Sequence, residues 1–276
     1  MNNKNLNFVF FGGEPLAVPV LEKLFKTGLV PKVIVCNPDK PAGRNLKITP
    51  PPTKLWAIEH NVSTIQPEKL DESFIKEFKL LGCDFGVVVA YGKIIPKEIV
   101  NFTPLGLINI HPSLLPIYRG PAPIVAPILN GDSQTGVSII KIDEEMDHGP
   151  ILAQKRIDLN GNEFIQDLEK TLAELSGELL VKVLEEYSKG GLELKEQDHS
   201  KAIYVKKIAK ADGEINLEDN AIRNWRKFRA YHTWPRTFFF KDGKRIIISD
   251  AILENNKFTI KKIIPEGGKE VGYKVT

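Results

Sequence analysis

A short segment of the chain, residues 109–116, carries residue types suited to acid–base chemistry. The apolar run 106–110 predicts a β-strand, and side chains alternate along a strand, so Asn109 and His111 should point to the same side. In open α/β sheets, ligands bind at the carboxyl ends of the strands. A neutral imidazole accepts a proton near pH 7, and an amide donates to a developing oxyanion. Asn and His can also stand at the end of a strand because they stabilise a turn or form hydrogen bonds there. The residue types alone leave both a catalytic role and this structural role open.

A carboxylate partner for the imidazole is available further along the chain. Asp147 lies in Met-Asp-His-Gly, residues 146–149, between two strand-like runs. A carboxylate beside His111 would orient the ring and raise its pKa. Asp143, Glu144 and Glu145 lie nearby, and spacing alone does not choose among the four. His148 is a second candidate base, although its position next to a glycine favours a turn.

Other signatures of chemistry are weak. Gly12 and Gly13 follow the first strand-like run, but the G-x-G-x-x-G spacing and a Walker lysine are both missing, which disfavours a dinucleotide or P-loop site. Cys36 and Cys83 are too few for a disulfide framework or a thiolate zinc site. No serine near a candidate base lies in a G-x-S-x-G context, which disfavours a serine hydrolase. Because no cluster of metal-ligating residues is visible in the sequence, we expect no metal cofactor.

Apolar runs alternate with amphipathic stretches through the first 195 residues. The strand-like runs are 6–11, 33–36, 62–65, 84–90, 106–110, 136–142 and 151–157. The helix-like stretches are 15–26, 71–81, 122–129 and 163–187. Strands that alternate with crossover helices predict an α/β fold with a mostly parallel sheet covered on both faces.

The pattern changes near residue 196. We expect a first domain over residues 1–195, a linker over 196–204 and a second domain over 205–276. In the second, a helix over 219–229 precedes strand-like runs at 237–240, 245–249 and 258–264, which predicts a small β-rich, barrel-like unit. The chain from residue 201 onward holds 17 basic and 9 acidic residues, against 21 and 26 before it. This asymmetry indicates either a polyanionic partner or a lysine-rich exposed surface.

The composition is that of an ordinary globular protein, with 42% apolar and 26% charged residues among 276. Apolar runs stay far below the roughly 20 residues that a membrane helix needs. The N-terminus leads into the first strand-like run without the pattern of a signal peptide. We therefore expect a cytoplasmic protein with no membrane partner.

Several motifs together resemble the signature of the 10-formyltetrahydrofolate-dependent formyltransferases. They are the Asn-x-His element at Asn109 and His111, the Ser-Leu-Leu-Pro loop at 113–116, the Tyr-Arg-Gly segment at 118–120, and the Asp-x-Gly element at Asp147 and Gly149. Residues 88–96 resemble the folate-side segment of the family, and the resemblance extends over residues 8–235. It implies a Rossmann-like catalytic domain and formyl transfer that needs no metal, because the formyl donor is already activated.

The resemblance also implies roles for individual residues. His111 would accept or relay a proton, Asn109 would donate to the oxyanion, and Asp147 would support the imidazolium form of His111. The folate would lie against residues of two segments. These residues are Val89, Tyr91, Gly92, Ile94, Ser113, Leu114, Leu115 and Pro116.

The loop from Asn37 to Lys54 resembles one that methionyl-tRNA formyltransferases carry after the second strand. It implies initiator tRNA charged with methionine as the acceptor, with phosphate contacts from Lys40, Arg44 and Lys47. By its chemistry alone, the loop is rich in Pro and Gly and holds cations that could contact phosphates or stay exposed.

Two features depart from the family pattern. Residues 12–15 read Gly-Gly-Glu-Pro where a Gly-Thr-Pro turn is more common, and the β-rich tail is several strands short of the usual C-terminal barrel. A shortened tail favours the main alternative, a sugar-nucleotide N-formyltransferase with the same three catalytic residues. A hydrolase that releases formate and an inert tRNA- or folate-binding protein are further alternatives. We expect a monomer.

Overall fold

The computed structural model describes residues 6–42, 46–188, 191 and 193–273, and they form two compact units. The first unit contains Met1–Arg119, Gly136–Lys155 and Thr171–Ala202, and the second contains Gly120–Thr135, Arg156–Lys170 and Ile203–Thr276. Because the units interleave along the chain, the domain boundary expected at residues 196–204 stays a prediction. Within the described ranges, no helix is long and apolar enough to cross a membrane.

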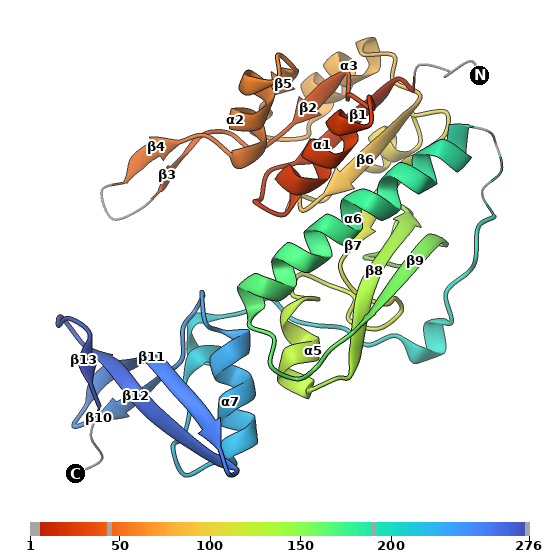
Figure 1. The fold of residues 1–276 in the computed structure, drawn as a ribbon. Helices are drawn as coiled ribbons and strands as arrows, with labels where there is room; N and C mark the ends of the chain where they lie inside the picture. The colour runs from red at the N-terminus through yellow and green to blue at the C-terminus, as the bar shows by residue number, and fades with distance from the viewer. Residues whose placement is uncertain (1–5, 43–45, 189–190, 192, 274–276) are drawn as a thin grey trace. The chain divides into compact units, whose positions relative to one another are not determined.

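A seven-stranded sheet forms the centre of the first unit (Figure 1), in the order β5-β2-β1-β6-β7-β8-β9. The strands are β1 (Phe8–Gly12), β2 (Val33–Val35), β5 (Ser63–Ile65), β6 (Phe85–Val89), β7 (Leu107–His111), β8 (Gln134–Lys141) and β9 (Ile151–Asp158). β1 pairs in parallel with β2 and β6, β2 with β5, and β6 with β7, whereas β8 is antiparallel to β7. The predicted α/β fold with a mostly parallel sheet is confirmed.

The helices of this unit follow from apolar residues at helical spacing. They are α1 (Ala17–Lys26), α2 (Pro52–Glu59), α3 (Glu72–Leu80), α4 (Lys97–Val100) and α6 (Ile165–Ser188), of which α6 begins in the second unit. In α1, Val20, Leu21 and Leu24 are buried on one side. Asp71 is the N-cap residue of α3, and its side chain accepts hydrogen bonds from two backbone N–H groups of the first turn.

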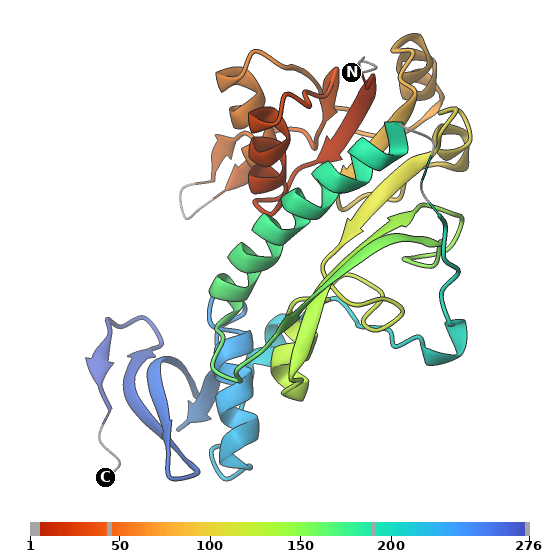
Figure 2. The same ribbon diagram turned by 45° about the vertical axis from the view of Figure 1, so that its right-hand side comes forward.

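Both faces of the sheet are covered because successive side chains of a strand point to opposite sides. On one face, Val9 and Phe11 belong to a buried cluster with Phe74 and Phe78 of α3. On the other face, the ring of Phe8 stacks on Phe85, which contacts Tyr187 of α6. In Figures 1 and 2, α1 and α6 lie side by side on that face. The strands β1, β2 and β6 are therefore wholly buried, as is typical of a parallel sheet covered on both faces.

The strand order reverses next to β1. The chain proceeds from β1 to β2 and β5 on one side and then returns to β6 on the other. Ligands of open α/β sheets bind at such a reversal, outside the carboxyl ends of the strands. His111 is the last residue of β7, the parallel neighbour of β6, so it lies at this end of the sheet.

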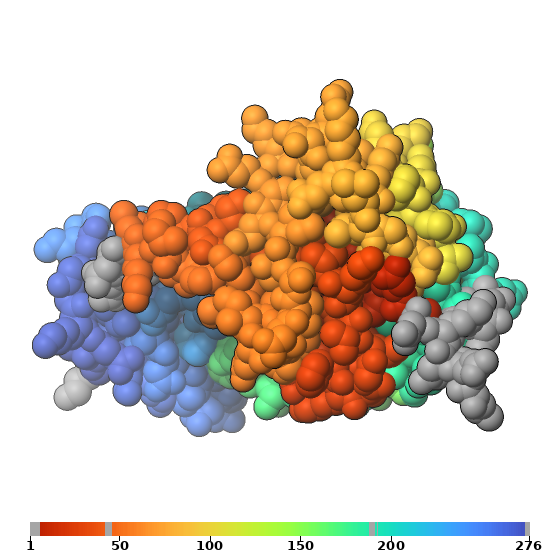
Figure 3. Space-filling view, turned by 90° about the horizontal axis from the view of Figure 1, so that it is seen from above, coloured from red at the N-terminus to blue at the C-terminus, as the bar shows by residue number. Residues whose placement is uncertain are grey.

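One part of the loop after β2 is a β-hairpin, which the sequence analysis did not predict. β3 (Lys40–Ala42) pairs in antiparallel fashion with β4 (Lys47–Thr49). The hairpin extends away from the sheet of its unit in Figure 1, and its atoms belong to the orange surface in Figure 3. The helix α2 follows and was also not predicted. Its Pro-rich start resembles a loop, yet proline is favoured at the first positions of a helix because its missing N–H needs no partner there.

The described part of the second unit includes the helices α5 (Val125–Asn130) and α7 (Ala221–Ala230), the first turns of α6 and a small antiparallel sheet. The strands, in sheet order, are β10 (Phe238–Lys241), β11 (Lys244–Glu254), β12 (Lys257–Pro265) and β13 (Val271–Gly272). Short 3-10 helices cover His199–Lys201 in the first unit and Lys210–Gly213 in the second. Phe228 of α7 packs with Phe239, Ile248 and Ile260 of the sheet. The expected β-rich unit is confirmed, although β11 continues past residue 249 through a register shift at Asp250.

Candidate active site

Three polar side chains predicted to act together meet at the carboxyl end of β7. His111 Nδ1 lies 3.5 Å from Asp147 Oδ1. Asn109 Nδ2 lies 3.4 Å from the same carboxylate oxygen. Both distances are longer than the roughly 2.7–3.2 Å that is usual for a strong hydrogen bond. The imidazole and the amide therefore converge on one oxygen.

The other ring nitrogen of His111 fixes the tautomer of the neutral ring. Nε2 lies 2.8 Å from the backbone carbonyl oxygen of Tyr118. Because a carbonyl oxygen can only accept, Nε2 must carry the hydrogen and donate it. The neutral ring then keeps its lone pair on Nδ1, facing Asp147. Nδ1 is therefore the basic atom of the site.

Burial controls the protonation of His111, whose side chain is only 5% exposed. Loss of solvation lowers the pKa of His111 below its ordinary value of 6.5, and the positive charge of Arg119 lowers it further. Asp147 and the Tyr118 carbonyl oppose this lowering. The ring is therefore neutral at pH 7 and gains stabilisation from Asp147 when it takes up a proton.

The turn that carries Asp147 has a constrained backbone. Asp147 adopts a left-handed conformation with φ of 51°, which Asp tolerates better than most residues. At Gly149, a Cβ atom would lie 1.9 Å from the Lys141 carbonyl oxygen, so only glycine fits. This close approach explains the glycine of the Asp-x-Gly element.

The structure distinguishes Asp147 from the acidic residues beside it. The Asp143 carboxylate lies 2.6 Å from His148 Nδ1, and Glu144 pairs with Lys97. Glu145 is exposed. Of the four neighbouring carboxylates, Asp147 is the one placed beside His111, and His148 is engaged with Asp143 instead.

A hydrogen-bond network holds the loop at residues 113–116. Ser138 Oγ donates to the Ser113 carbonyl at 2.6 Å and accepts from Leu115 N at 3.0 Å. Gln154 Nε2 donates to the Leu115 carbonyl at 2.8 Å. Ser138 is paired in register with His111 across β7 and β8. The loop is thus tied to the same strands that position the imidazole.

The residues expected to contact folate differ in their exposure. Val89, Tyr91, Ser113 and Leu115 are buried, Leu114 and Pro116 are half-buried, and Gly92 and Ile94 are exposed. The Tyr91 ring packs edge-on against Phe11 in the core, and Ser113 Oγ donates to the Ile117 carbonyl. The buried side chains therefore shape the loops, and the exposed Ile94 and half-buried Leu114 offer apolar surface. Their role in folate binding stays a prediction.

Two of the cations expected to contact tRNA, Lys40 and Lys47, lie on the β3–β4 hairpin. Lys40 and Lys47 are exposed. Lys54 Nζ instead forms an ion pair with Asp39 at 2.9 Å, so its charge is balanced locally. Arg44 lies outside the described residues.

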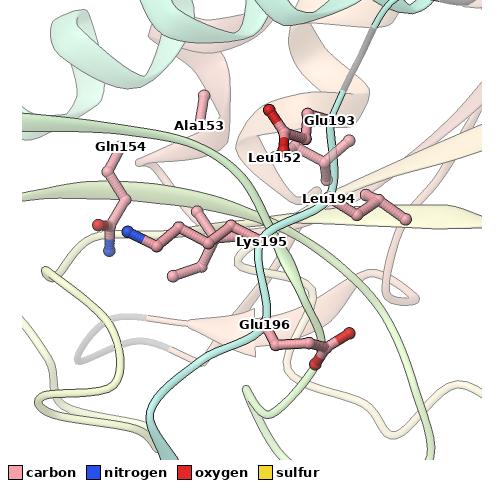
Figure 4. A pocket seen from close by; sticks show the side chains of 8 residues that line it. Leu152, Ala153, Gln154, Glu193, Leu194, Lys195 and Glu196 are labelled. Carbon is pink, nitrogen blue, oxygen red and sulfur yellow. The ribbon is translucent and has the colours of Figure 1, made fainter.

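A pocket of about 600 Å³ lies beside β9 rather than at the Asn109–His111–Asp147 cluster. Figure 4 shows how residues 193–196 run past β9 and line this pocket with Leu152, Ala153 and Gln154. None of its lining residues belongs to the predicted catalytic or folate-binding sets.

Sequence reasoning missed several groups around the site. The Tyr118 carbonyl, Ser138 and Gln154 act through contacts that no local motif encodes. Gln197 was assigned to a linker, yet it is 5% exposed and contacts the turn that carries Asp147. Ser138 stands between the buried apolar residues Val137 and Ile139, and this polar residue within an apolar run is the signal that could have identified Ser138.

Comparisons with known proteins agree over nearly the whole chain. Residues 5–184 match the family model described as "Formyl transferase". Residues 207–273 match the model described as "Formyl transferase, C-terminal domain". A methionyl-tRNA formyltransferase of Chloroflexus aggregans is 42% identical over 247 residues, covering 89% of this chain and 80% of the relative. One from a Sulfurihydrogenibium species is 39% identical over 254 residues, covering 91% and 82%.

Among solved structures, an N-formyltransferase from Helicobacter canadensis in complex with folinic acid and dTDP-3-aminofucose superimposes with a TM-score of 0.71. It shares 18% identity and covers 98% of this chain and 100% of its own. At this identity, the likeness concerns the fold.

Proposed function

Since the chain belongs to the formyl transferase family, we propose that it transfers the formyl group of 10-formyltetrahydrofolate to the α-amino group of methionyl initiator tRNA. The product would be N-formylmethionyl-tRNA, used in translation initiation in the cytoplasm. The observation that carries the reaction type is the convergence of Asn109 and His111 on one oxygen of Asp147. The acceptor follows from relatives about 40% identical that are named methionyl-tRNA formyltransferases.

His111 and Asp147 would move the proton. As the amine nitrogen bonds to the formyl carbon, one proton passes to Nδ1 of the neutral His111. The resulting imidazolium faces Asp147 Oδ1, whose charge stabilises it. His111 then returns the proton to the nitrogen that leaves when the original formyl C–N bond breaks. The protein is regenerated, and each bond formed is matched by one broken.

Asn109 would stabilise the charge that develops on the formyl oxygen. Its Nδ2 group can donate only if its amide stays oriented, and Asp147 Oδ1 accepts from that same group. A preoriented donor in a partly buried site stabilises a developing oxyanion strongly because no solvent must reorganise. One carboxylate would thus orient both catalytic side chains.

The residues beside His111 suit a folate as formyl donor. β6 and β7 are parallel neighbours, so the segment after β6 and the loop at 113–116 meet at one end of the sheet. Ile94 is 90% exposed, and the half-buried Leu114 adds a second apolar side chain. An apolar surface next to polar backbone fits a flat aromatic ring with hydrogen-bonding edges.

The hairpin suits a polyanionic acceptor. In its register, Lys40 is opposite Thr49 and Lys47 is opposite residue 42, so both lysines project from the same face of the hairpin. Two exposed cations on one face can contact successive phosphates. The proposal assigns them, with Arg44, to the tRNA.

The test offers two acceptors in parallel. Labelled 10-formyltetrahydrofolate is incubated with the protein and either methionyl initiator tRNA or amino-sugar nucleotides. Label on the tRNA is the expected result. Label on the sugar alone would overturn the acceptor, and formate release without any amine would overturn the transfer reaction.

A further inference from the structure

The segment between α6 and the second unit is anchored to the first unit at two successive points. Lys195 and Ile151 exchange backbone hydrogen bonds of 2.7 and 2.9 Å, which ties the segment to the start of β9. Figure 4 shows residues 193–196 along this path. Two residues later, the buried Gln197 reaches the turn that carries Asp147. The segment predicted to be a linker therefore contacts the turn that carries Asp147.

The Gln197 amide holds both ends of the Asp147 turn. Its Nε2 donates to the Asp147 carbonyl oxygen at 2.9 Å and to the Gly149 carbonyl oxygen at 2.7 Å. Each of its two N–H hydrogens thus reaches one end of a three-residue turn. The left-handed backbone at Asp147 makes such external support necessary, because this conformation is sparsely populated on its own.

Arg119 fixes the orientation of that amide. Its Nε and Nη2 atoms lie 3.3 and 2.7 Å from Gln197 Oε1. Because a guanidinium only donates, the amide oxygen must face Arg119 and the amide nitrogen must face the turn. Arg119 is 1% exposed, and its Nη2 also donates to His199 Nδ1 at 2.8 Å. The amide therefore cannot flip without losing buried hydrogen bonds.

We infer that Gln197 is a positioning residue that holds the Asp147 carboxylate beside His111 by clamping the backbone of residues 147–149. It touches neither substrate nor the reacting atoms, and the inference rests on the proposed function. Without the clamp, the turn can relax and Oδ1 moves away from both the imidazole and the Asn109 amide. Outer-shell partners that orient metal-ligating side chains affect activity by roughly 10–100-fold, and we expect an effect of that order for a residue that orients Asp147.

The test uses the full chain with Gln197→Met, which keeps the volume but neither donates nor accepts, and Gln197→Ala. The matched control is Glu196→Ala, an exposed neighbour on the same segment. We expect kcat to fall 10–100-fold in the Gln197 variants with KM for the folate nearly unchanged, and no change in the control. A loss confined to KM, or kcat equal to wild type, would overturn the inference.

A second readout does not depend on turnover. Among the described residues, the charge of Asp147 raises the pKa of His111 and the charge of Arg119 lowers it. If the clamp holds Asp147, the NMR titration midpoint of His111 should move to lower pH in Gln197→Met and stay in place in Glu196→Ala. An unchanged midpoint in a folded Gln197 variant would overturn the inference even if the proposed acceptor proved wrong. An inactive wild type with a shifted midpoint would instead refute only the proposed function.

Discussion

The end of β7 and the β3–β4 hairpin lie in the same unit but are built in opposite ways. At the end of β7, His111 is buried, and both of its ring nitrogens face a specific oxygen atom. On the hairpin, Lys40 and Lys47 are exposed to solvent at paired positions of two short strands. Under the proposed function, the first region would depend on distances between particular atoms, and the second would depend on charge.

This contrast sets the size of the effects to be expected. A buried polar atom that loses its partner pays the full cost of desolvation, whereas an exposed charge is screened by salt and water. Substitutions near His111 should therefore change turnover by orders of magnitude. Substitutions on the hairpin should change acceptor binding modestly and additively.

The largest effect is expected for His111→Asn. This change keeps a polar side chain of similar size but removes the basic nitrogen, and general base catalysis typically contributes about 10²–10⁴ in rate. Single-turnover formyl transfer would measure the loss. A variant that folds, binds folate and transfers within threefold of wild type would contradict the role of His111.

Asn109→Ala should cost somewhat less. Removal of one oxyanion donor typically lowers turnover by about 10²–10³. We expect kcat to fall by that factor while folate affinity, measured by equilibrium binding, remains close to wild type. A loss that appears in affinity alone would show that Asn109 binds substrate uniformly and does not act in the transition state.

Asp147→Asn separates charge from shape. In the wild type, burial holds the pKa of His111 below 6.5, so the acidic limb of kcat/KM should lie below pH 6.5. Asp147 opposes that lowering, and its neutral replacement should move the limb to still lower pH while the plateau falls. If the acidic limb of kcat/KM moved to higher pH in Asp147→Asn, the result would contradict the placement of the Asp147 carboxylate beside His111.

The smallest effects are expected on the hairpin. Lys40→Ala and Lys47→Ala should each weaken use of the charged tRNA and reduce the slope of log K against log salt by about one, because each removes one phosphate contact. Folate binding should not change. Arg44→Ala belongs in the same series as a prediction from sequence. Equal losses for folate and tRNA would contradict the assignment of the loop.

Much of the fold could be predicted because strand and helix periodicities are local. The apolar runs that became β1, β6 and β7 are continuous, and the spacing of Asn109 and His111 placed both side chains at one strand end. The predicted α/β sheet followed from the alternation of such runs with amphipathic, helix-like stretches.

The rest depended on contacts between residues distant in sequence. Spacing did not distinguish Asp147 from its acidic neighbours, because ion pairs with His148 and Lys97 determine which carboxylates are engaged elsewhere. Gln197 lies 50 residues beyond Asp147, within a polar stretch typical of a linker. The hairpin was missed because its strands are only three residues long.

The most direct test of the account is whether His111 and Asp147 act as one unit. Formyl transfer to methionyl initiator tRNA would be measured for His111→Asn, Asp147→Asn and the double variant at saturating folate donor. Because Asp147 supports the imidazole and also orients Asn109, the loss in the double variant should exceed that of His111→Asn but fall well short of the product of the two single losses. Losses that multiply in the double variant would contradict the account, because they would mean that the two residues act independently.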